Sequence, residues 1–170
     1  VVAGAPSLLV ILFGLPLVQG NVSALLNVSF CLYIFSQNEA ERAALIEARA
    51  PAALVLLAGL PAIDPRVVNN IARALGGISL SDAGKAACIA ALAPSALVLL
   101  ARLSAVHAYV DAAYNVAWAI ANIASCAVGK AAFNGPSARA ALALLASQPA
   151  VAAHAAAAQQ VARALQCFPP

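Results

Sequence analysis

Apolar residues in this chain recur with the three-to-four-residue spacing of helices. No stretch alternates polar and apolar residues for long enough to predict a strand. The pattern runs through a proline, a short apolar helix, a variable loop, a long amphipathic helix and a short linking helix. One copy predicts helices over 52–60, 66–79 and 83–93, with a loop through Pro61 and Asp64-Pro65. We therefore expect an all-α fold.

A second copy of this pattern follows directly. It predicts helices over 95–103 and 109–125, a short linking helix over 128–133, and an exposed loop around His107. The stop signal Asn134-Gly135-Pro136 ends this copy. Two further copies, before and after, make four.

Independent markers recur with nearly the same period. Side-chain amides lie 43, 45 and 45 residues apart, at Asn27, Asn70, Asn115 and Gln160. Prolines lie 45, 43 and 42 residues apart, at Pro6, Pro51, Pro94 and Pro136. A Gly-Lys-Ala-Ala sequence at 84–87 returns at 129–132. A period of about 40 to 47 residues is typical of stacked helical repeats, so the chain is expected to form one repeat domain over 1–170. Its approximate units are 6–50, 51–93, 94–135 and 136–170.

The repeats resemble those of the armadillo family. The segment 38–57 is similar to the junction between armadillo units, and Trp118-Ala-Ile-Ala-Asn-Ile-Ala-Ser125 resembles the W-x-x-x-N motif in the third helix of importin-alpha. This resemblance covers nearly the whole chain and implies a right-handed α-solenoid of about four units. HEAT-type arrays, which have a similar period, are the main alternative. The family includes import receptors, adhesion adaptors and axonemal scaffolds, so the resemblance by itself specifies little about function.

In armadillo arrays the third helices line a concave groove that holds an extended peptide. Helical geometry then predicts which side chains face that groove, because positions i, i+3 and i+7 share one face. An amide there can donate to and accept from a peptide backbone, and a tryptophan offers a flat apolar wall. The candidate groove residues are Asn27, Phe30, Asn70, Arg73, Asp111, Asn115, Trp118, Asn122, Gln160 and Arg163. The alternative is that the amides hydrogen-bond neighbouring repeats and only hold the stack together.

Only the third unit has both the tryptophan and the second amide. The other units carry different residues at these two places: Phe30 and Ile34, Arg73 and Gly77, and Arg163 and Cys167. Importin-like grooves also use acidic residues to attract basic peptides, and here only Asp111 is placed to do so. The arginines instead favour a partner segment of acidic or mixed charge, and a nuclear import adaptor is disfavoured.

The composition is extreme for a soluble chain, with 64% hydrophobic residues and a mean hydropathy of +0.93. Alanine alone supplies 47 of the 170 residues, which raises hydropathy through a helix former that adds little apolar surface. Glycines and prolines interrupt the uncharged start, at Gly4, Pro6, Gly14 and Pro16. Buried solenoid helices are therefore favoured over a membrane-embedded protein.

The charged residues and cysteines suggest no cofactor. The nine basic residues are scattered, which disfavours nucleic acid as a partner. The four cysteines show no metal-ligand spacing and are interpreted as buried free thiols in a reducing compartment. Neither histidine joins a nucleophile in a catalytic motif, so no catalytic or metal site is expected.

The sequence thus favours a non-catalytic scaffold that binds a protein or peptide segment along its third-helix face, with no cofactor. The alternative is an architectural subunit of a large assembly, because neither end shows a polar cap and both ends are expected to be covered by further repeats or neighbouring subunits. Either role is expected inside the cell, in the cytoplasm or in a cytoskeletal or ciliary assembly.

Overall fold

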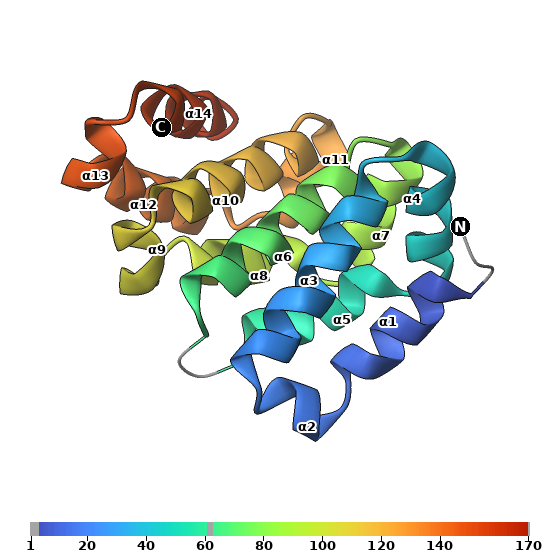
Figure 1. The fold of residues 1–170 in the computed structure, drawn as a ribbon. Helices are drawn as coiled ribbons and strands as arrows, with labels where there is room; N and C mark the ends of the chain where they lie inside the picture. Colours follow the sequence, from blue (N-terminus) through green and yellow to red (C-terminus); the bar gives the residue numbers. More distant parts are fainter. Residues whose placement is uncertain (1–3, 61–62, 170) are drawn as a thin grey trace.

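The computed structural model describes residues 4–60 and 63–169. Within these residues the chain forms helices joined by turns and short loops, which confirms the all-α prediction. The helices stack in three ladders, each containing about one helix per repeat (Figure 1). A ladder here means a row of helices of which each contacts the next.

The long-helix ladder holds the structure together along its length. Its helices are α3 (Val22–Ser36), α6 (Pro65–Ile78), α10 (Val110–Ile123) and α14 (Ala155–Gln166). Consecutive members pack along one another, and these are the most extensive helix contacts in the described residues. They correspond to the long amphipathic helix predicted in each unit.

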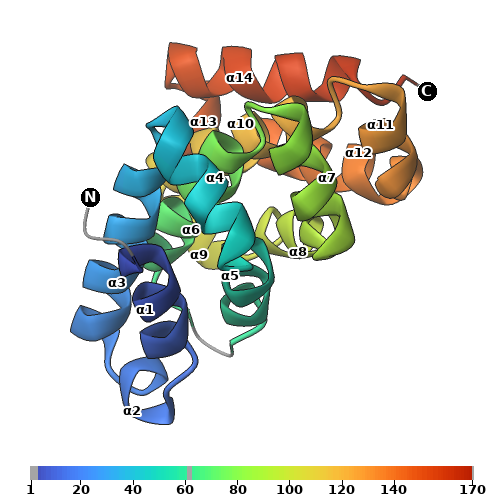
Figure 2. The same ribbon diagram turned by 90° about the vertical axis from the view of Figure 1, so that its right-hand side faces the viewer.

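Two ladders of mostly shorter helices pack behind the long helices, as the turned view shows (Figure 2). One contains α1 (Ala5–Phe13), α5 (Ala50–Ala58), α8 (Ala93–Leu100) and α12 (Gly135–Ala146). The other contains α4 (Glu39–Glu47), α7 (Asp82–Ala90) and α11 (Ala127–Ala132). Three helices of four or five residues, α2 (Pro16–Gln19), α9 (Ser104–Ala108) and α13 (Pro149–Ala152), lead into long helices. The result is an α-solenoid.

The recurring prolines mark where one ladder passes to the next. Pro51, Pro94 and Pro136 lie in the first turn of α5, α8 and α12, where a missing backbone N–H breaks no helical hydrogen bond. Just before two of these helices, Arg49 and Leu92 take a left-handed backbone with φ of 58° and 63°. The same strained turn therefore joins the linking helix to the next short helix in both repeats.

The repeated Gly-Lys-Ala-Ala sequence has a steric cause. A Cβ atom on Gly84 would lie 1.7 Å from the carbonyl oxygen of Ile78, and one on Gly129 would lie 1.7 Å from that of Ile123. The linking helices α7 and α11 thus pass directly against the last turn of the preceding long helix. Only glycine permits that approach, which explains why the motif keeps the repeat period.

Two local predictions were wrong, and others shift by a few residues. His107 does not lie in an exposed loop, because it belongs to α9 and is half-buried, with Nε2 3.0 Å from the carbonyl oxygen of Ala101. The cysteines are not all buried, since Cys31 is exposed and only Cys88 is fully enclosed. Pro61, in the predicted loop, lies outside the described residues.

Candidate functional site

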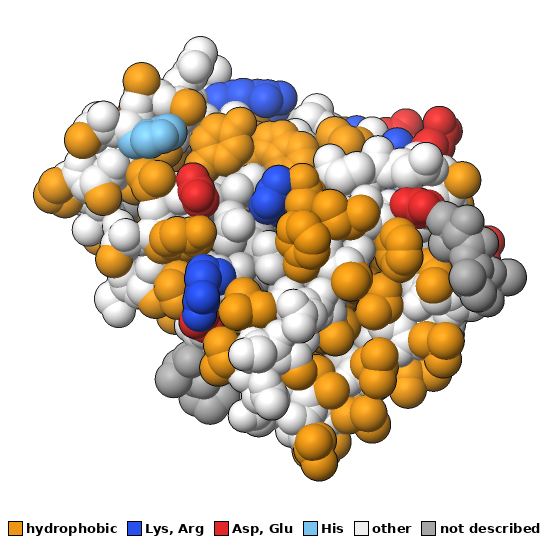
Figure 3. Space-filling view, in the orientation of Figure 1, with side chains coloured by type: hydrophobic (Ala, Val, Ile, Leu, Met, Phe, Trp, Pro, Cys, Tyr) orange, Lys and Arg blue, Asp and Glu red, His pale blue; other side chains and the backbone are white. Residues whose placement is uncertain are grey.

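The exposed edges of the long helices form one continuous surface, which we call the long-helix face. Figure 3 shows hydrophobic side chains gathered over α3, α6 and α10, with basic and acidic side chains spaced among them. Further hydrophobic side chains cover α1 and α2 at the N-terminal end. All of the candidate residues chosen from the sequence lie on α3, α6, α10 or α14.

The repeated amides of the two middle units bond to the preceding repeat. Asn70 is 8% exposed, and its Nδ2 donates to Ser29 Oγ on α3 at 3.1 Å. Asn115 Nδ2 donates to Asn69 Oδ1 on α6 at 2.9 Å. Its next amide along the helix, Asn122, donates to the carbonyl oxygen of Gly76 on α6 at 3.4 Å. These contacts support the stack-holding role for the amides, and they show that the row points toward the neighbouring helix.

The two outer members of the amide row differ from the middle ones. Asn27 on α3 is exposed to solvent. Gln160 on α14 is only 7% exposed, and its buried Nε2 has no hydrogen-bond acceptor among the described residues. The row is therefore satisfied in the middle of the array and unsatisfied at its C-terminal member.

The ring of Trp118 packs directly against a glycine of the preceding repeat. A Cβ atom on Gly76 would lie 2.3 Å from Trp118 Cζ3, so only a residue without a side chain accommodates the indole ring. A Cβ on the adjacent Gly77 would lie 2.3 Å from Ser36 Oγ on α3. One glycine thus faces each neighbouring long helix. The two glycines thus allow close packing on both sides of α6, and Trp118 is left half-buried.

Arg73 lies against an aromatic side chain that the sequence reasoning missed. Its guanidinium carbon lies 3.6 Å from the centre of the Tyr33 ring, and Nη2 donates to the Tyr33 hydroxyl. Phe30, 49% exposed, lies beside the same tyrosine with ring centres 5.9 Å apart. Together these residues make a partly exposed aromatic and cationic surface. A signal was available, because Tyr33 follows Phe30 by three residues and so lies one turn along the same side of α3.

The remaining charged candidates are set apart from one another. Asp111 and Arg163 are both exposed. Arg66, at the start of α6, pairs with Asp64 at 2.9 Å, and this bond holds the pKa of the Asp64 carboxyl below its usual value. In the described part of the chain the only other ion pair joins Lys85 to Asp82. Arg163 is therefore a cation without an acidic partner there.

A hollow of about 460 Å³ lies between α10 and α14 on this face. Two of its lining residues, Gln160 and Arg163, were chosen from the sequence. The others, Tyr114, Ala156, Gln159 and Gln166, were not. The long-helix face therefore includes a recessed part between α10 and α14.

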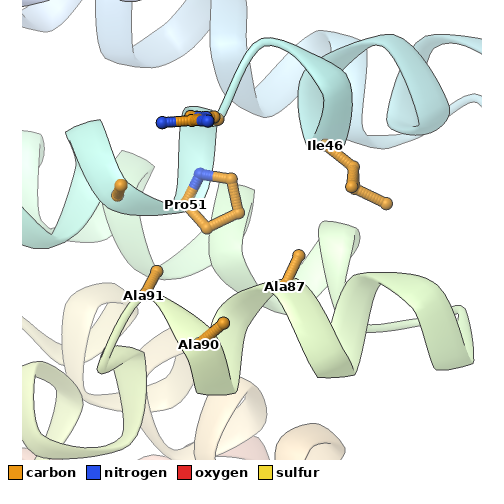
Figure 4. Close-up of a pocket in the computed structure, with 7 residues that line it drawn as sticks. Ile46, Pro51, Ala87, Ala90 and Ala91 are labelled. Atoms are coloured by element: carbon orange, nitrogen blue, oxygen red, sulfur yellow. The ribbon is translucent and has the colours of Figure 1, made fainter.

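A second hollow, of about 350 Å³, lies away from the long-helix face, between α4, α5 and α7. Figure 4 shows Ile46 and Pro51 on one side of it and Ala87, Ala90 and Ala91 on the other. The lining is mostly apolar, with Arg49 as the charged member. It was not predicted from the sequence.

The histidines have local bonding roles. His154 caps α14, where its Nδ1 accepts from the backbone N–H of Ala157 at 3.3 Å, and His107 contacts a backbone carbonyl as described above. Across residues 4–60 and 63–169, no three His, Cys, Asp or Glu side chains come together in a way that could hold a metal ion. Each histidine therefore has a structural contact of its own.

No helix in the described ranges is, by itself, long and apolar enough to cross a bilayer. One consecutive pair, α7 and α8, reaches the required length and composition together, but it is bent by 77° at the break.

Comparison with solved structures supports the same fold. No family model and no curated protein matches the sequence. Among solved structures, a designed armadillo repeat protein is 26% identical with a TM-score of 0.78, over 98% of this chain and 66% of that one. Another, solved in complex with the peptide (KR)4, is 27% identical with a TM-score of 0.78, over 98% of this chain and 65% of that one.

A third similar structure is of computationally designed armadillo repeat proteins for modular peptide recognition, at 27% identity and a TM-score of 0.74. It is matched over 98% of this chain and 66% of that chain, so this chain spans slightly less than two thirds of the length of these proteins. The repeat period, the three helix ladders and these similarities agree. The chain is an armadillo-like repeat protein.

Proposed function

We propose that this chain is a non-catalytic scaffold that binds an extended segment of a partner protein along its long-helix face, anchored beside Trp118 and Asn122. The main support is the half-buried indole of Trp118, which packs against Gly76 of the preceding long helix. Similar designed proteins bind peptides, as the (KR)4 complex illustrates. Partly buried aromatic side chains commonly act as anchors in such interfaces.

The expected partner is acidic or mixed in charge. The positions equivalent to Trp118 in the second and fourth units carry Arg73 and Arg163, so two cations lie along the path of a docked segment. A basic peptide like that bound by the designed protein would be repelled at both places. Asp111 alone would attract a basic residue.

The amides contribute less to this binding than the sequence suggested. Asn70 and Asn115 use donor hydrogens on the preceding repeat, and Asn122 is only 8% exposed. Asn122 still has a carbonyl oxygen and a second N–H available. We therefore assign most of the affinity to the aromatic and arginine side chains and a smaller part to backbone hydrogen bonds.

A selection with random extended dodecapeptides tests this proposal. We expect enriched peptides to bind the wild-type chain, and Trp118→Ala to weaken them by about 30-fold or more, since anchors of this type contribute about 2 kcal/mol or more. Leu56→Ala is the matched control, because Leu56 is 74% exposed on α5, away from the long-helix face. Helix content measured by circular dichroism confirms folding of each variant. Unchanged peptide binding by folded Trp118→Ala would refute the proposal.

The second candidate is an architectural role, and the N-terminal end of the array favours it. On α3, Phe30 and Ile34 are 49% and 45% exposed at positions that pack on a preceding long helix in later repeats. On α1, Leu8 and Ile11 are each 61% exposed. Apolar surface of this kind marks interaction sites, and the helical edge fits another helical repeat in the same register.

The C-terminal end is more polar than the N-terminal end. We therefore expect a neighbouring subunit to cover the N-terminal end only. The exposed side chains of α14 include Gln159, Arg163 and Gln166, so this end has polar groups of its own. Sedimentation velocity tests the architectural role. We expect the wild-type chain to associate with rising concentration and the Ile11→Glu/Ile34→Glu variant to remain a monomer. A wild-type monomer at all concentrations would contradict this role.

A further inference from the structure

The hollow between α10 and α14 is lined almost entirely by side chains that are able to form hydrogen bonds. Its members are Tyr114, Ala156, Gln159, Gln160, Arg163 and Gln166. Its volume of about 460 Å³ is the largest among the hollows described on this molecule. A lining of three amides, a phenol and a guanidinium suits a charged or strongly polar group.

The hollow exists because the repeat changes at four equivalent positions. Between α6 and α10, Gly76 receives the ring of Trp118, and Asn69 accepts from Asn115. A shift of 45 residues gives the equivalent pairs between α10 and α14: Ala121 with Arg163, and Tyr114 with Gln160. The methyl group of Ala121 and the flexible stem of Arg163 do not reproduce the glycine–indole contact. Tyr114 offers no side-chain carbonyl to Gln160.

One consequence is an amide without a partner. Gln160 is 93% buried, and its Nε2 finds no acceptor in the described part of the chain, although the side chain lines the hollow. A buried donor without an acceptor is unfavourable, and an acceptor brought in by a ligand removes that cost. The torsion that turns the amide has a broad preference, so a small rotation presents an N–H to the hollow.

The positive charge of Arg163, which lines the hollow, favours a negatively charged ligand. Arg163 has no acidic partner among the described residues. The acid closest in sequence on α10 is Asp111, one turn before Tyr114, and it does not line the hollow. A lysine or arginine side chain would be repelled there, and an apolar side chain would leave the amides unsatisfied.

We propose that this hollow binds the carboxylate of a glutamate side chain in the segment docked on the long-helix face. Arg163 forms the ion pair, Gln160 donates an N–H to a carboxylate oxygen, and Tyr114, Gln159 and Gln166 supply further donors. This inference rests on the proposed function, because it assigns the ligand of one position along the same face.

A matched pair of peptides tests it. The probes are fluorescein-(Ser-Glu)4-amide and fluorescein-(Ser-Gln)4-amide, which differ only in the charge of the side chain. We expect the wild-type chain to bind the glutamate peptide at least tenfold more tightly, as measured by fluorescence anisotropy. Arg163→Gln should abolish the preference, and Gln160→Met should reduce it by about threefold.

Lys130→Gln is the control, because it removes the same charge from an exposed position on α11 and should preserve the preference. The glutamate peptide should also shift a side-chain NH2 signal in the nitrogen-15 NMR spectrum that is missing in Gln160→Met. If Lys130→Gln and Arg163→Gln weakened the preference for the glutamate peptide equally, net charge alone would explain the preference. That result would overturn the proposal.

Two further outcomes separate this inference from the proposed function. Equal affinity for both peptides, still weakened by Trp118→Ala, would overturn the carboxylate site while preserving the binding face. No binding of either peptide at millimolar concentration would overturn both. A gain in affinity only for a (Ser-Gln)4 peptide with a free terminal carboxylate would assign the hollow to a chain end and overturn the side-chain proposal.

Discussion

The interfaces on the two sides of α10 use the same positions of the repeat but pack differently. Toward α6, the side is closed by a glycine under Trp118 and by the hydrogen bond from Asn115 to Asn69. Toward α14, the equivalent residues leave a hollow of about 460 Å³ and a buried amide without an acceptor. The difference teaches that a few substitutions can turn a stacking position into a binding position without altering the repeat.

Thiol labelling should show the largest contrast between the closed and open regions. Cys88 lies beneath α6, with Sγ 3.8 Å from the carbonyl oxygen of Leu75, and burial raises its pKa to about 12. Cys167 lies partly exposed just past the end of α14. At pH 8 we expect iodoacetamide to modify Cys167 at least about a thousandfold faster than Cys88, because the thiolate is the reactive form. Mass spectrometry of the digested protein measures both rates, and similar rates would show that the α6 region is open.

Filling the glycine position should damage the closed interface. Gly76→Ala places a methyl group against Trp118 and should lower the free energy of unfolding by about 2 kcal/mol, even after the gain in helix propensity. Gly135→Ala is the control, because a Cβ atom there meets nothing within 4 Å. Urea unfolding measures both variants. An unchanged midpoint for Gly76→Ala would mean that the indole does not pack on α6.

Replacing the amides should affect the two sides unequally. Asn115→Leu removes the bond to Asn69 and leaves a buried acceptor unpaired, so we expect a loss of about 1 to 2 kcal/mol. Gln160→Met removes a donor that already lacks an acceptor, and its unfolding free energy should change by less than about 0.5 kcal/mol or rise. Urea titrations again provide the comparison. Equal losses would show that Gln160 has a structural partner.

The smallest expected effect concerns the start of α6. Asp64 accepts from the backbone N–H of Arg66 and pairs with its side chain, whereas Tyr109 provides no side-chain cap for α10. The lowered pKa of Asp64 means that its contribution to stability is present above the unfolded value of 3.8 and is lost as the pH falls through the folded value. Asp64→Asn should therefore flatten the pH dependence of the urea midpoint below about pH 4. If the urea midpoints of the wild type and Asp64→Asn had the same pH dependence, the Asp64–Arg66 pair would not contribute to stability.

The sequence predicted the shape of the molecule from period alone. The Gly-Lys-Ala-Ala repeat marks the close approach of a linking helix to a long helix, and the prolines mark the first turns of the short helices. The amides of the two middle units bond to the preceding repeat. These features are visible in sequence because backbone contact tolerates almost no substitution.

The sequence did not predict whether the repeated amides face the neighbouring long helix or the solvent. Helices such as α3 are apolar on all sides, so periodicity does not determine which edge faces a neighbour and which faces solvent. Tyr33 and Tyr114 were missed because the groove rows were counted at i, i+3 and i+7 from each repeated amide, and neither tyrosine stands at those positions. His107 was misplaced because a single turn of helix, α9, is too short to leave a periodic signal.

Hydrogen exchange of the wild-type chain, free and with (Ser-Glu)4-amide, shows directly whether the long-helix face is the binding surface. In the free protein, amides of α14 should exchange faster than those of α6 and α10, because the last interface is open. Saturating peptide should slow exchange in α10 and α14 together and leave α4, α5 and α7 unchanged. Protection confined to α4, α5 and α7, or no protection at all with bound peptide, would contradict the assignment of the long-helix face as the binding surface.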